Sequence, residues 1–304
     1  MAESQLRVYS ITDGIASECK KSSYQREKEI QKVIENNMEV FFGVRLLKSE
    51  FVITEGRMDS IGIDENNSPV IFEYKLNENQ NVINQGLFYL DWLMDHKGDF
   101  RFLVQEKFGT SSAEQVDWDQ PTLICVAREF TRYDLYAIKQ IDRNIRLVRY
   151  SKYDNDLLSL EYLNFSKAAS DSKIDNSVDR REVKQEVGSV HLKNLATADQ
   201  NIKDLYHSLC EYIDNLGDDI NASQQKLYLA YKKIHNFACI LIQKKRLVVN
   251  LQLDVNEFEE EKNFSRNVSD VGHHGTGDYQ IFINNEETFN KALPLIKKAY
   301  DLST

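Results

Sequence analysis

The amino-acid sequence predicts an α/β amino-terminal domain, in which helices flank a mixed sheet, and a smaller α+β carboxy-terminal domain with an antiparallel sheet. Three observations support this fold class. Over residues 1–164, apolar strand-like runs alternate with segments of helical periodicity. Residues 165–200 are polar and contain few large apolar side chains, which predicts a linker. Residues 201–304 begin and end with amphipathic helices that enclose several short strand-like runs.

The elements of the first domain follow from the spacing of apolar residues. Residues 24–42 place apolar side chains three and four positions apart, which predicts a helix. The near-continuous apolar run 121–127 is typical of a buried strand. A helix over 133–141, a strand over 145–150 and an edge strand over 157–163 complete the alternation.

The most informative segment is a predicted β-hairpin. Residues 56–64 and 70–75 are two short apolar-rich runs around a turn that contains asparagine, serine and proline. Side chains alternate along a strand, so Glu73 and Lys75 point to the same face, and Asp59 falls opposite them in the expected register. Two carboxylates can share a divalent cation, and an adjacent amine can orient or deprotonate water. This combination indicates metal-assisted hydrolysis of phosphodiesters.

The order of these residues, Asp59, a spacer and then Glu73-Tyr74-Lys75, resembles the PD-(D/E)xK nuclease superfamily. Met58 stands where many members have a proline, a departure that the superfamily often shows.

The predicted helices on either side of the hairpin make this resemblance more specific. A predicted helix precedes the hairpin, and a second one, containing residues 85–93, follows it. The region 24–95 therefore resembles the NucS-like group within that superfamily. The resemblance implies a restriction-endonuclease-like fold with Mg²⁺ or Mn²⁺ as the cofactor.

The resemblance also implies a role for each residue. Asp59 and Glu73 would bind the metal ion, and Lys75 would orient the attacking water. A carboxylate on the first helix would act through water. The predicted catalytic set is Glu27, Asp59, Glu73, Lys75, Gln85 and Tyr89, with Glu29 or Glu35 as alternatives to Glu27 and with Gln85 and Tyr89 contacting phosphate or water.

Some of these residues also have simpler interpretations. The acidic residues of the first helix could form only its solvated face, and Tyr89 could pack in the core. Asp64 lies at the hairpin turn, where a carboxylate stabilises the turn itself. Arg57 could contact a phosphate or pair with Glu55. Asp134 is interpreted as a carboxylate at a helix start.

Composition and charge restrict the classes of function. The 304 residues carry 48 acidic and 38 basic side chains, a net charge of −10, whereas tight non-specific DNA binders are usually basic. This predicts modest affinity for bare nucleic acid. The four cysteines lack metal-ligand spacing, and the sequence shows neither a secretory signal nor a membrane-spanning run. These features predict a cytoplasmic protein with reduced thiols.

In the carboxy-terminal domain, helices are predicted over 202–216 and 286–300, with strands between them. This domain resembles an uncharacterised domain that ends several nuclease and restriction-type proteins. Its lysines and arginine would form a basic patch if they shared one face; otherwise they would mark a solvated hairpin. The predicted nucleic-acid-binding residues are Lys232, Lys233, Lys244, Lys245 and Arg246.

Together these features predict a metal-dependent endonuclease, with DNA favoured over RNA as substrate and a role in defence or repair. The carboxy-terminal domain would recognise substrate or mediate assembly, and a homodimer is compatible with the resemblance. The alternative is a non-catalytic nucleic-acid-binding or interaction module on the same fold.

Overall fold

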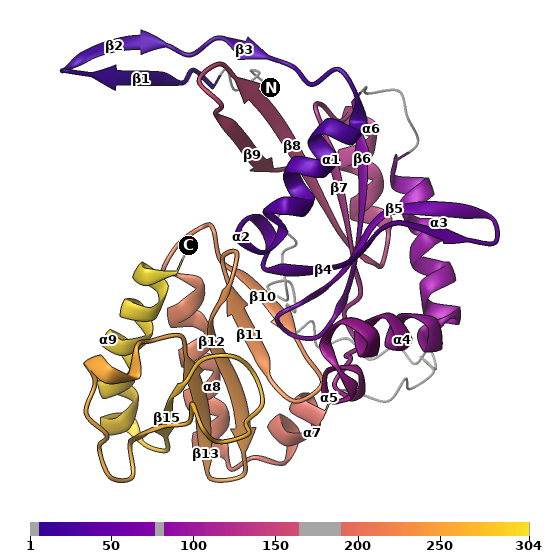
Figure 1. Ribbon diagram of the computed structural model, residues 1–304. Coiled ribbons are helices and arrows are strands. Elements are labelled where there is room, and N and C mark those ends of the chain that lie inside the picture. The colour runs from indigo at the N-terminus through magenta and orange to yellow at the C-terminus, as the bar shows by residue number, and fades with distance from the viewer. Residues whose placement is uncertain (1–5, 77–81, 164–189, 304) are drawn as a thin grey trace.

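The computed structural model describes residues 6–76, 82–163 and 190–303. Figure 1 shows two units, each built of helices around its own sheet, and a separate β-hairpin that projects from the first unit. The projecting hairpin consists of β1 (Tyr9–Thr12) and β2 (Ile15–Glu18), whose residues are mostly exposed. The predicted fold class is confirmed: a mixed sheet flanked by helices precedes an antiparallel sheet with helices.

The first sheet has the strand order β3-β8-β7-β6-β5-β4, and β9 pairs with β8. Strands β6, β7 and β8 are parallel to one another, and the remaining pairs are antiparallel. The strands are β3 (Lys21–Ser22), β4 (Val44–Ile53), β5 (Gly56–Asp64), β6 (Pro69–Lys75), β7 (Thr122–Ala127), β8 (Asn144–Tyr153) and β9 (Leu158–Tyr162).

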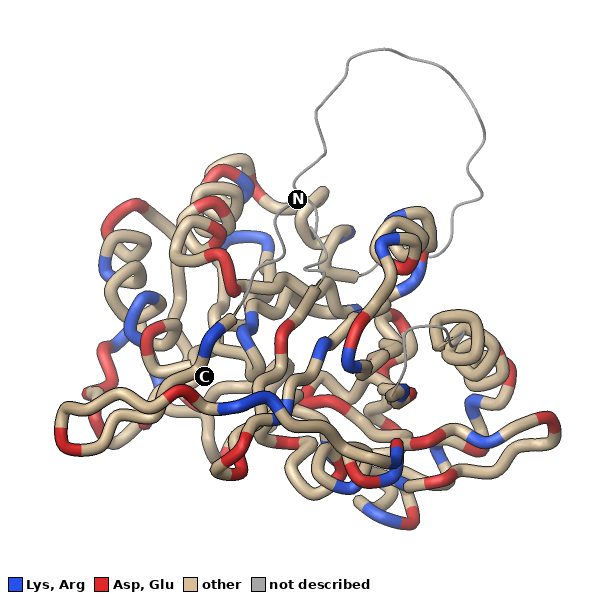
Figure 2. The backbone as a smooth tube through the Cα atoms, turned by 90° about the horizontal axis from the view of Figure 1, so that it is seen from above, with Lys and Arg blue, Asp and Glu red and all other residues tan. Residues whose placement is uncertain are grey.

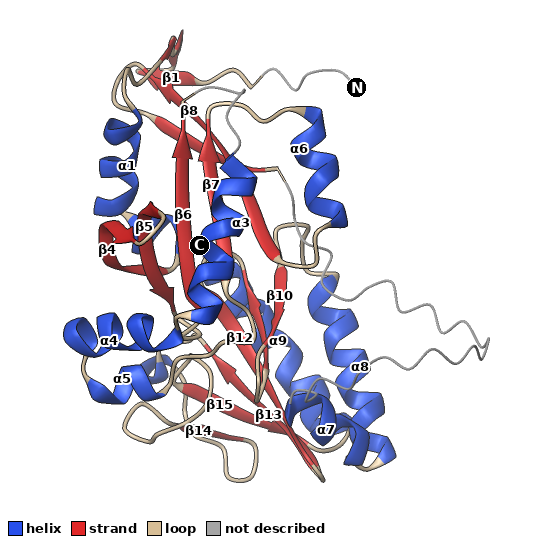
Figure 3. Cartoon of the chain, turned by 90° about the vertical axis from the view of Figure 1, so that its right-hand side faces the viewer, coloured by secondary structure: helices blue, strands red, loops and turns tan. Residues whose placement is uncertain are grey.

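Helices cover both faces of this sheet, and Figure 3 shows α1 and α6 on opposite sides of strands β6 to β8. One face packs against α1 (Glu27–Asn36) and α2 (Met38–Phe42) through Ile30, Ile34 and neighbouring apolar residues. The other face packs mainly against α3, with the remaining helices around it. These helices are α3 (Val82–Asp95), α4 (Lys97–Phe108), α5 (Thr110–Glu114), α6 (Arg132–Ala137) and the 3₁₀ helix η1 (Ile138–Gln140).

Local signals explain several helix ends. The single helix predicted over 24–42 is divided at Asn37, and α2 ends at Gly43, whose φ of 64° is favourable for glycine. Thr131 and Asp134 form a capping box at the start of α6, which confirms Asp134 as a helix-start carboxylate.

The second unit contains a six-stranded antiparallel sheet with the order β10-β11-β12-β13-β15-β14. Helices α8 and α9 pack on one face of it and bury a separate apolar core. The strands are β10 (Asn221–Gln224), β11 (Leu229–Lys232), β12 (Asn236–Gln243), β13 (Arg246–Leu251), β14 (Ser265–Asn267) and β15 (Tyr279–Ile283). The helices are α7 (Val190–Thr197), α8 (Gln200–Asp214), α9 (Glu286–Leu302) and the 3₁₀ helix η2 (Val255–Glu257).

The predicted linker differs from the structure at its carboxy-terminal end. Residues 190–197 form α7, whose His191 is buried, so this part of residues 165–200 belongs to the second unit. Residues 164–189, which contain the rest of the predicted linker, lie outside the described residues.

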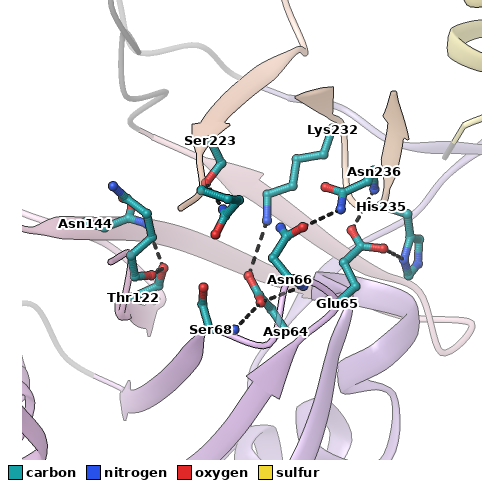
Figure 4. Close-up of polar contacts among 12 residues, drawn as sticks. Asp64, Glu65, Asn66, Ser68, Thr122, Asn144, Ser223, Lys232, His235 and Asn236 are labelled. Carbon is teal, nitrogen blue, oxygen red and sulfur yellow. Dashed lines mark hydrogen bonds and ion pairs between the residues drawn. The ribbon is translucent and has the colours of Figure 1, made fainter. Parts of the chain in front are cut away.

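The two units meet at the turn between β5 and β6 (Figure 4). Asp64 Oδ1 accepts hydrogen bonds from the backbone N–H groups of Asn66, at 2.9 Å, and Ser68, at 2.8 Å, which confirms its role in the turn. Asp64 Oδ2 also lies 3.7 Å from Lys232 Nζ of the second unit. Asn66 Oδ1 accepts hydrogen bonds from Asn236 Nδ2, at 2.6 Å, and from Tyr228 Oη, at 3.1 Å.

Charged residues are distributed over both units. Figure 2 shows acidic and basic positions next to one another along much of the chain. Among the described residues, no helix is long and apolar enough to cross a membrane.

Candidate active site

The predicted pairing of β5 with β6 is observed. The ladder pairs Ile61 with Ile71 and ends with Ser60 opposite Phe72, so Asp59 and Glu73 are the next residues of the two strands. Strand alternation places Glu73 on the face covered by α3, while Phe72 and Tyr74 pack on the face covered by α1.

Asp59 and Glu73 are in direct contact through the backbone. Asp59 Oδ2 accepts a hydrogen bond from the Tyr74 N–H at 3.0 Å, and Glu73 Oε1 accepts one from the Asp59 N–H at 3.4 Å. The Asp59 carboxylate therefore accepts a hydrogen bond from the backbone of β6, and the Glu73 carboxylate accepts one from the backbone of β5. Glu73 is fully buried, and its Oε2 atom has no hydrogen-bond partner among the described residues. Asp59 is partly exposed, so the pair is accessible from its side.

The electrostatic environment of the pair disfavours two negative charges. Burial, followed by the charge of Asp59, raises the pKa of Glu73 to about 9. Burial also raises the pKa of Asp59, although the Tyr74 hydrogen bond and the charge of Lys75 oppose this shift. In the protein without a bound cation, Glu73 is therefore protonated at neutral pH. A bound cation would favour ionisation of both carboxyl groups.

Lys75 and Glu27 lie beside this pair. Lys75 Nζ is 3.7 Å from Glu27 Oε2, and Glu27 Oε1 accepts a hydrogen bond from the Leu76 N–H at 3.4 Å. The positive charge of Lys75 opposes the rise in the pKa of both Asp59 and Glu73, whereas the negative charge of Glu27 adds to the rise in the pKa of Asp59. The structure therefore brings Glu27, Asp59, Glu73 and Lys75 into one electrostatic environment.

The two alternatives to Glu27 have other contacts. Glu29 accepts hydrogen bonds from the Gln25 N–H and from Arg26 Nε at the start of α1. Glu35 Oε1 accepts one from Ser60 Oγ at 2.7 Å, on the opposite face of the sheet from Glu73. Of the three acidic residues, Glu27 is thus the one that contacts Lys75.

Gln31 is a site residue that the sequence did not reveal. Its side-chain Nε2 donates to the backbone oxygen of Asp59 at 3.0 Å and to Glu35 Oε1 at the same distance. Gln31 is buried and links α1 to the backbone that carries the first carboxylate. A glutamine between an isoleucine and a lysine of an amphipathic helix has no distinctive sequence signal.

Gln85 and Tyr89 contact each other and the beginning of β5. Tyr89 Oη accepts hydrogen bonds from Gln85 Nε2 and from the Arg57 N–H, both at 3.2 Å. Tyr89 is almost fully buried and packs in the core, as the simpler interpretation expected. Its hydroxyl nevertheless anchors the backbone two residues before Asp59. The Arg57 side chain, which the sequence left open between a phosphate contact and a pair with Glu55, pairs with Glu50 at 2.7 Å.

The residues at the hairpin fit a divalent cation. Asp59 and Glu73 supply carboxylate oxygens, which are the ligands that Mg²⁺ and Mn²⁺ prefer, and Glu73 Oε2 has no hydrogen-bond partner among the described residues. Among the described residues, no group of three or more histidine, cysteine, aspartate or glutamate side chains could hold a metal ion. A site here would therefore rest on two protein carboxylates with water as the other ligand.

The predicted basic patch of the second unit is wrong in part. Lys232 is only 3% exposed and pairs with Asp64 at the contact between the units, so it cannot bind nucleic acid. Lys233 contacts Asp219 and the Tyr300 ring and donates to the backbone oxygen of Ser303. Lys244 and Lys245 are exposed in the β12–β13 turn, next to Arg246.

Comparisons with solved structures give low-scoring partial matches. A repair endonuclease from Pyrococcus abyssi is 18% identical, with a TM-score of 0.29 over 42% of this chain and 49% of that protein. A structure described as an EndoMS–dsDNA complex is 20% identical, with a TM-score of 0.29 over 42% of this chain and 48% of that one. The matched region thus spans about half the length of these proteins. Similarity at this level does not establish an activity.

Sequence comparisons cover more of the chain. Residues 193–303 match a family model described as "Domain of unknown function (DUF5655)". A protein of Haemophilus influenzae (strain ATCC 51907 / DSM 11121 / KW20 / Rd), described as "Uncharacterized protein", is 33% identical over 300 residues, which are 97% of this chain and 99% of that protein. The chain therefore belongs to the same family as this Haemophilus influenzae protein.

Proposed function

We propose that the protein is a divalent-metal-dependent nuclease that hydrolyses phosphodiester bonds in DNA. One observation carries this proposal: a fully buried glutamate with an unpartnered oxygen lies opposite a second carboxylate and beside a lysine. Buried carboxyl groups with raised pKa values are common at functional sites. A purely structural hairpin has no need for this arrangement, because burying an unpaired polar atom destabilises the fold.

The side chains have distinct roles in this proposal. Asp59 and Glu73 would hold Mg²⁺ or Mn²⁺, which when bound would supply the positive charge that stabilises the developing charge on phosphate. Lys75, as an ammonium group, would donate a hydrogen bond to the attacking water or to a phosphate oxygen. Glu27 would hold that ammonium group in position through their 3.7 Å ion pair. The water oxygen would form a bond to phosphorus while the bond to the leaving ester oxygen breaks; the attacking water would lose a proton to solvent, and the leaving oxygen would take one up from solvent.

Gln85 and Tyr89 would act as positioning residues. Their hydrogen bonds would hold the backbone of Arg57, at the beginning of β5, against α3, and Gly56 lies next to the Tyr89 ring. An alanine Cβ at Gly56 would lie 2.9 Å from the Tyr89 ring, so the two elements approach closely. This contact restricts the path of the backbone that leads to Asp59.

A cleavage assay tests the proposal. Single-stranded, duplex, branched, mismatched and base-modified DNAs, with matched RNAs, are incubated with Mg²⁺ or Mn²⁺. We expect cation-dependent cleavage of DNA that falls by about 100-fold or more in Lys75→Ala, a typical loss when one hydrogen-bond donor that stabilises the transition state is removed. The matched control is Lys28→Ala, an exposed lysine on α1, which should cut like the wild type.

A further comparison excludes contamination, because Asp59→Ala should be inactive while a contaminating nuclease would persist in its preparation. Binding of DNA without cleavage under every condition would instead favour a non-catalytic binding module. Preferential cleavage of RNA would overturn the choice of DNA as substrate.

A further inference from the structure

The outer face of the second sheet carries a group of side chains separate from the carboxylate pair. Leu247, Val249 and Leu251 of β13 point into the core beneath α8 and α9. Strand alternation therefore directs Arg246 to the opposite face. Val248 pairs with Phe282 of β15, which places the Phe282 ring on that same outer face.

A cleft of about 570 Å³ opens at this position. The side chains that line it are cationic, polar or aromatic, and none is acidic: they belong to Arg246, Asn263, Ser265, Arg266, Phe282 and Asn284. In a chain with a net charge of −10, a cleft with two arginines and no carboxylate among its lining residues is a local positive site.

The two guanidinium groups are held in place by neutral partners. Arg246 Nε donates to Gln243 Oε1 at 2.7 Å, and Arg266 Nε donates to Gln280 Oε1 at 2.8 Å. Gln280 is itself buried and donates to Asn250 Oδ1 at 2.8 Å. Within the described ranges, neither arginine has a carboxylate at ion-pair distance, whereas Arg149 has two.

Both arginines also lie against an aromatic ring. The Cζ atoms of Arg246 and Arg266 are 4.3 Å and 5.4 Å from the centroid of the Phe282 ring. Guanidinium groups that keep their terminal N–H groups available bind phosphate. The Phe282 ring is only 9% exposed, so the planar surfaces more open to stacking are those of the two guanidinium groups that it supports.

We infer that this cleft binds a phosphate group attached to a nucleobase, with Arg246 and Arg266 contacting the phosphate and the planar groups contacting the base. The ligand is a nucleotide unit, either within a nucleic-acid strand or free in solution. This binding would not require the carboxylate pair of the first unit, so it stands independently of the proposed hydrolysis.

Fluorescence anisotropy of the full chain with a labelled single-stranded oligonucleotide tests this inference. EDTA is present, so that no cleavage takes place. The double variant Arg246→Gln/Arg266→Gln is compared with Lys193→Gln/Lys203→Gln, which removes the same charge from helices α7 and α8. We expect about a tenfold or greater loss of affinity in the arginine variant, because it loses charge-assisted hydrogen bonds, and little change in the lysine variant.

Two further measurements identify the ligand and the role of the ring. Phe282→Leu should weaken binding several-fold without changing the charge, and circular dichroism should show that every variant remains folded. Free dAMP is added as a competitor at the same concentration of nucleotide units as the oligonucleotide supplies. Strong competition would assign the cleft to free nucleotides, and weak competition would assign it to a nucleic-acid strand. Equal affinities of the arginine and lysine variants, or no binding of either ligand by the wild type, would overturn the inference.

Discussion

At the scale of single residues, Glu73 has the most unusual environment in the candidate site. It is fully buried, one of its oxygens lacks a partner, and its pKa is raised to about 9 by burial and by Asp59. In the unfolded chain its carboxyl group would have its ordinary pKa of 4.5. The folded protein therefore retains a proton that the unfolded chain releases between these two values.

This difference predicts that the free energy of unfolding of the metal-free protein falls as pH rises from about 5 to 9. In this pH window the unfolded state binds fewer protons than the folded state. Glu73 should therefore lower the free energy of unfolding by up to about 1 kcal/mol for each pH unit. Urea denaturation in EDTA at pH 6, 7 and 8 measures it. Glu73→Gln should remove most of the decrease, whereas Glu106→Gln, which changes an exposed residue of α4, should not. Parallel curves for all three proteins would contradict the raised pKa.

Sequence reasoning predicted which residues form the carboxylate pair, because strand alternation and a short turn define the register of a hairpin. It did not identify Gln31 or the contact between Tyr89 and Arg57. Both depend on how helices pack against β5, which is not encoded in any local spacing.

At the scale of elements, most strands and helices with strong apolar periodicity were predicted, although β4 (Val44–Ile53) was not, and several elements without such periodicity were missed. Strands β10 (Asn221–Gln224) and β14 (Ser265–Asn267) consist almost entirely of polar and small residues. They are strands because β11 and β15 supply hydrogen-bonding partners. Helix α4 was also missed: it has little separation of polar and apolar faces, and Phe102 within it is exposed.

The packing of α3 gives a prediction at this scale. A Cβ added to Gly86 would lie 2.5 Å from both Cδ atoms of Leu123 on β7, so Gly86→Ala should destabilise the fold by about 1–3 kcal/mol through overpacking. Gly98→Ala in α4 is the matched control. Apart from its chain neighbours and the backbone of its own helix, no heavy atom lies within 4 Å of its added Cβ, and the better helix propensity of alanine should leave stability unchanged or raise it by up to about 1 kcal/mol. Thermal denaturation measures both, and equal shifts would contradict the close packing of α3 on β7.

At the scale of the whole molecule, the second unit contacts the turn that connects the two strands of the candidate site. Lys232 and Lys233 look equivalent in the sequence, and both were predicted to bind nucleic acid. A register shift between Tyr231 and Lys232 changes the alternation of β11. The side chains of Tyr231 and Lys232 are therefore both buried, although they are neighbours in the strand. Only the tertiary structure reveals that Asp64, far away in the chain, is the partner of Lys232.

This contact predicts different effects for the two neighbouring lysines. Lys232→Ala would leave Asp64 buried without its counter-ion and should destabilise the protein by about 3 kcal/mol or more. Lys233→Ala removes an ion pair with Asp219 that is partly exposed, and should cost at most about 1 kcal/mol. Urea denaturation of both variants at neutral pH provides the comparison. Equal losses would show that the buried pair does not stabilise the contact between the units.

The central claim is that Asp59 and Glu73 together hold one divalent cation. Isothermal titration calorimetry with Mn²⁺ at pH 8 tests it most directly, on the wild type and on Asp59→Asn and Glu73→Gln. We predict binding of about one ion per chain by the wild type, accompanied by proton release as Glu73 ionises, and no measurable binding by either variant. Unchanged binding in both variants, or no binding by the wild type, would contradict the claim.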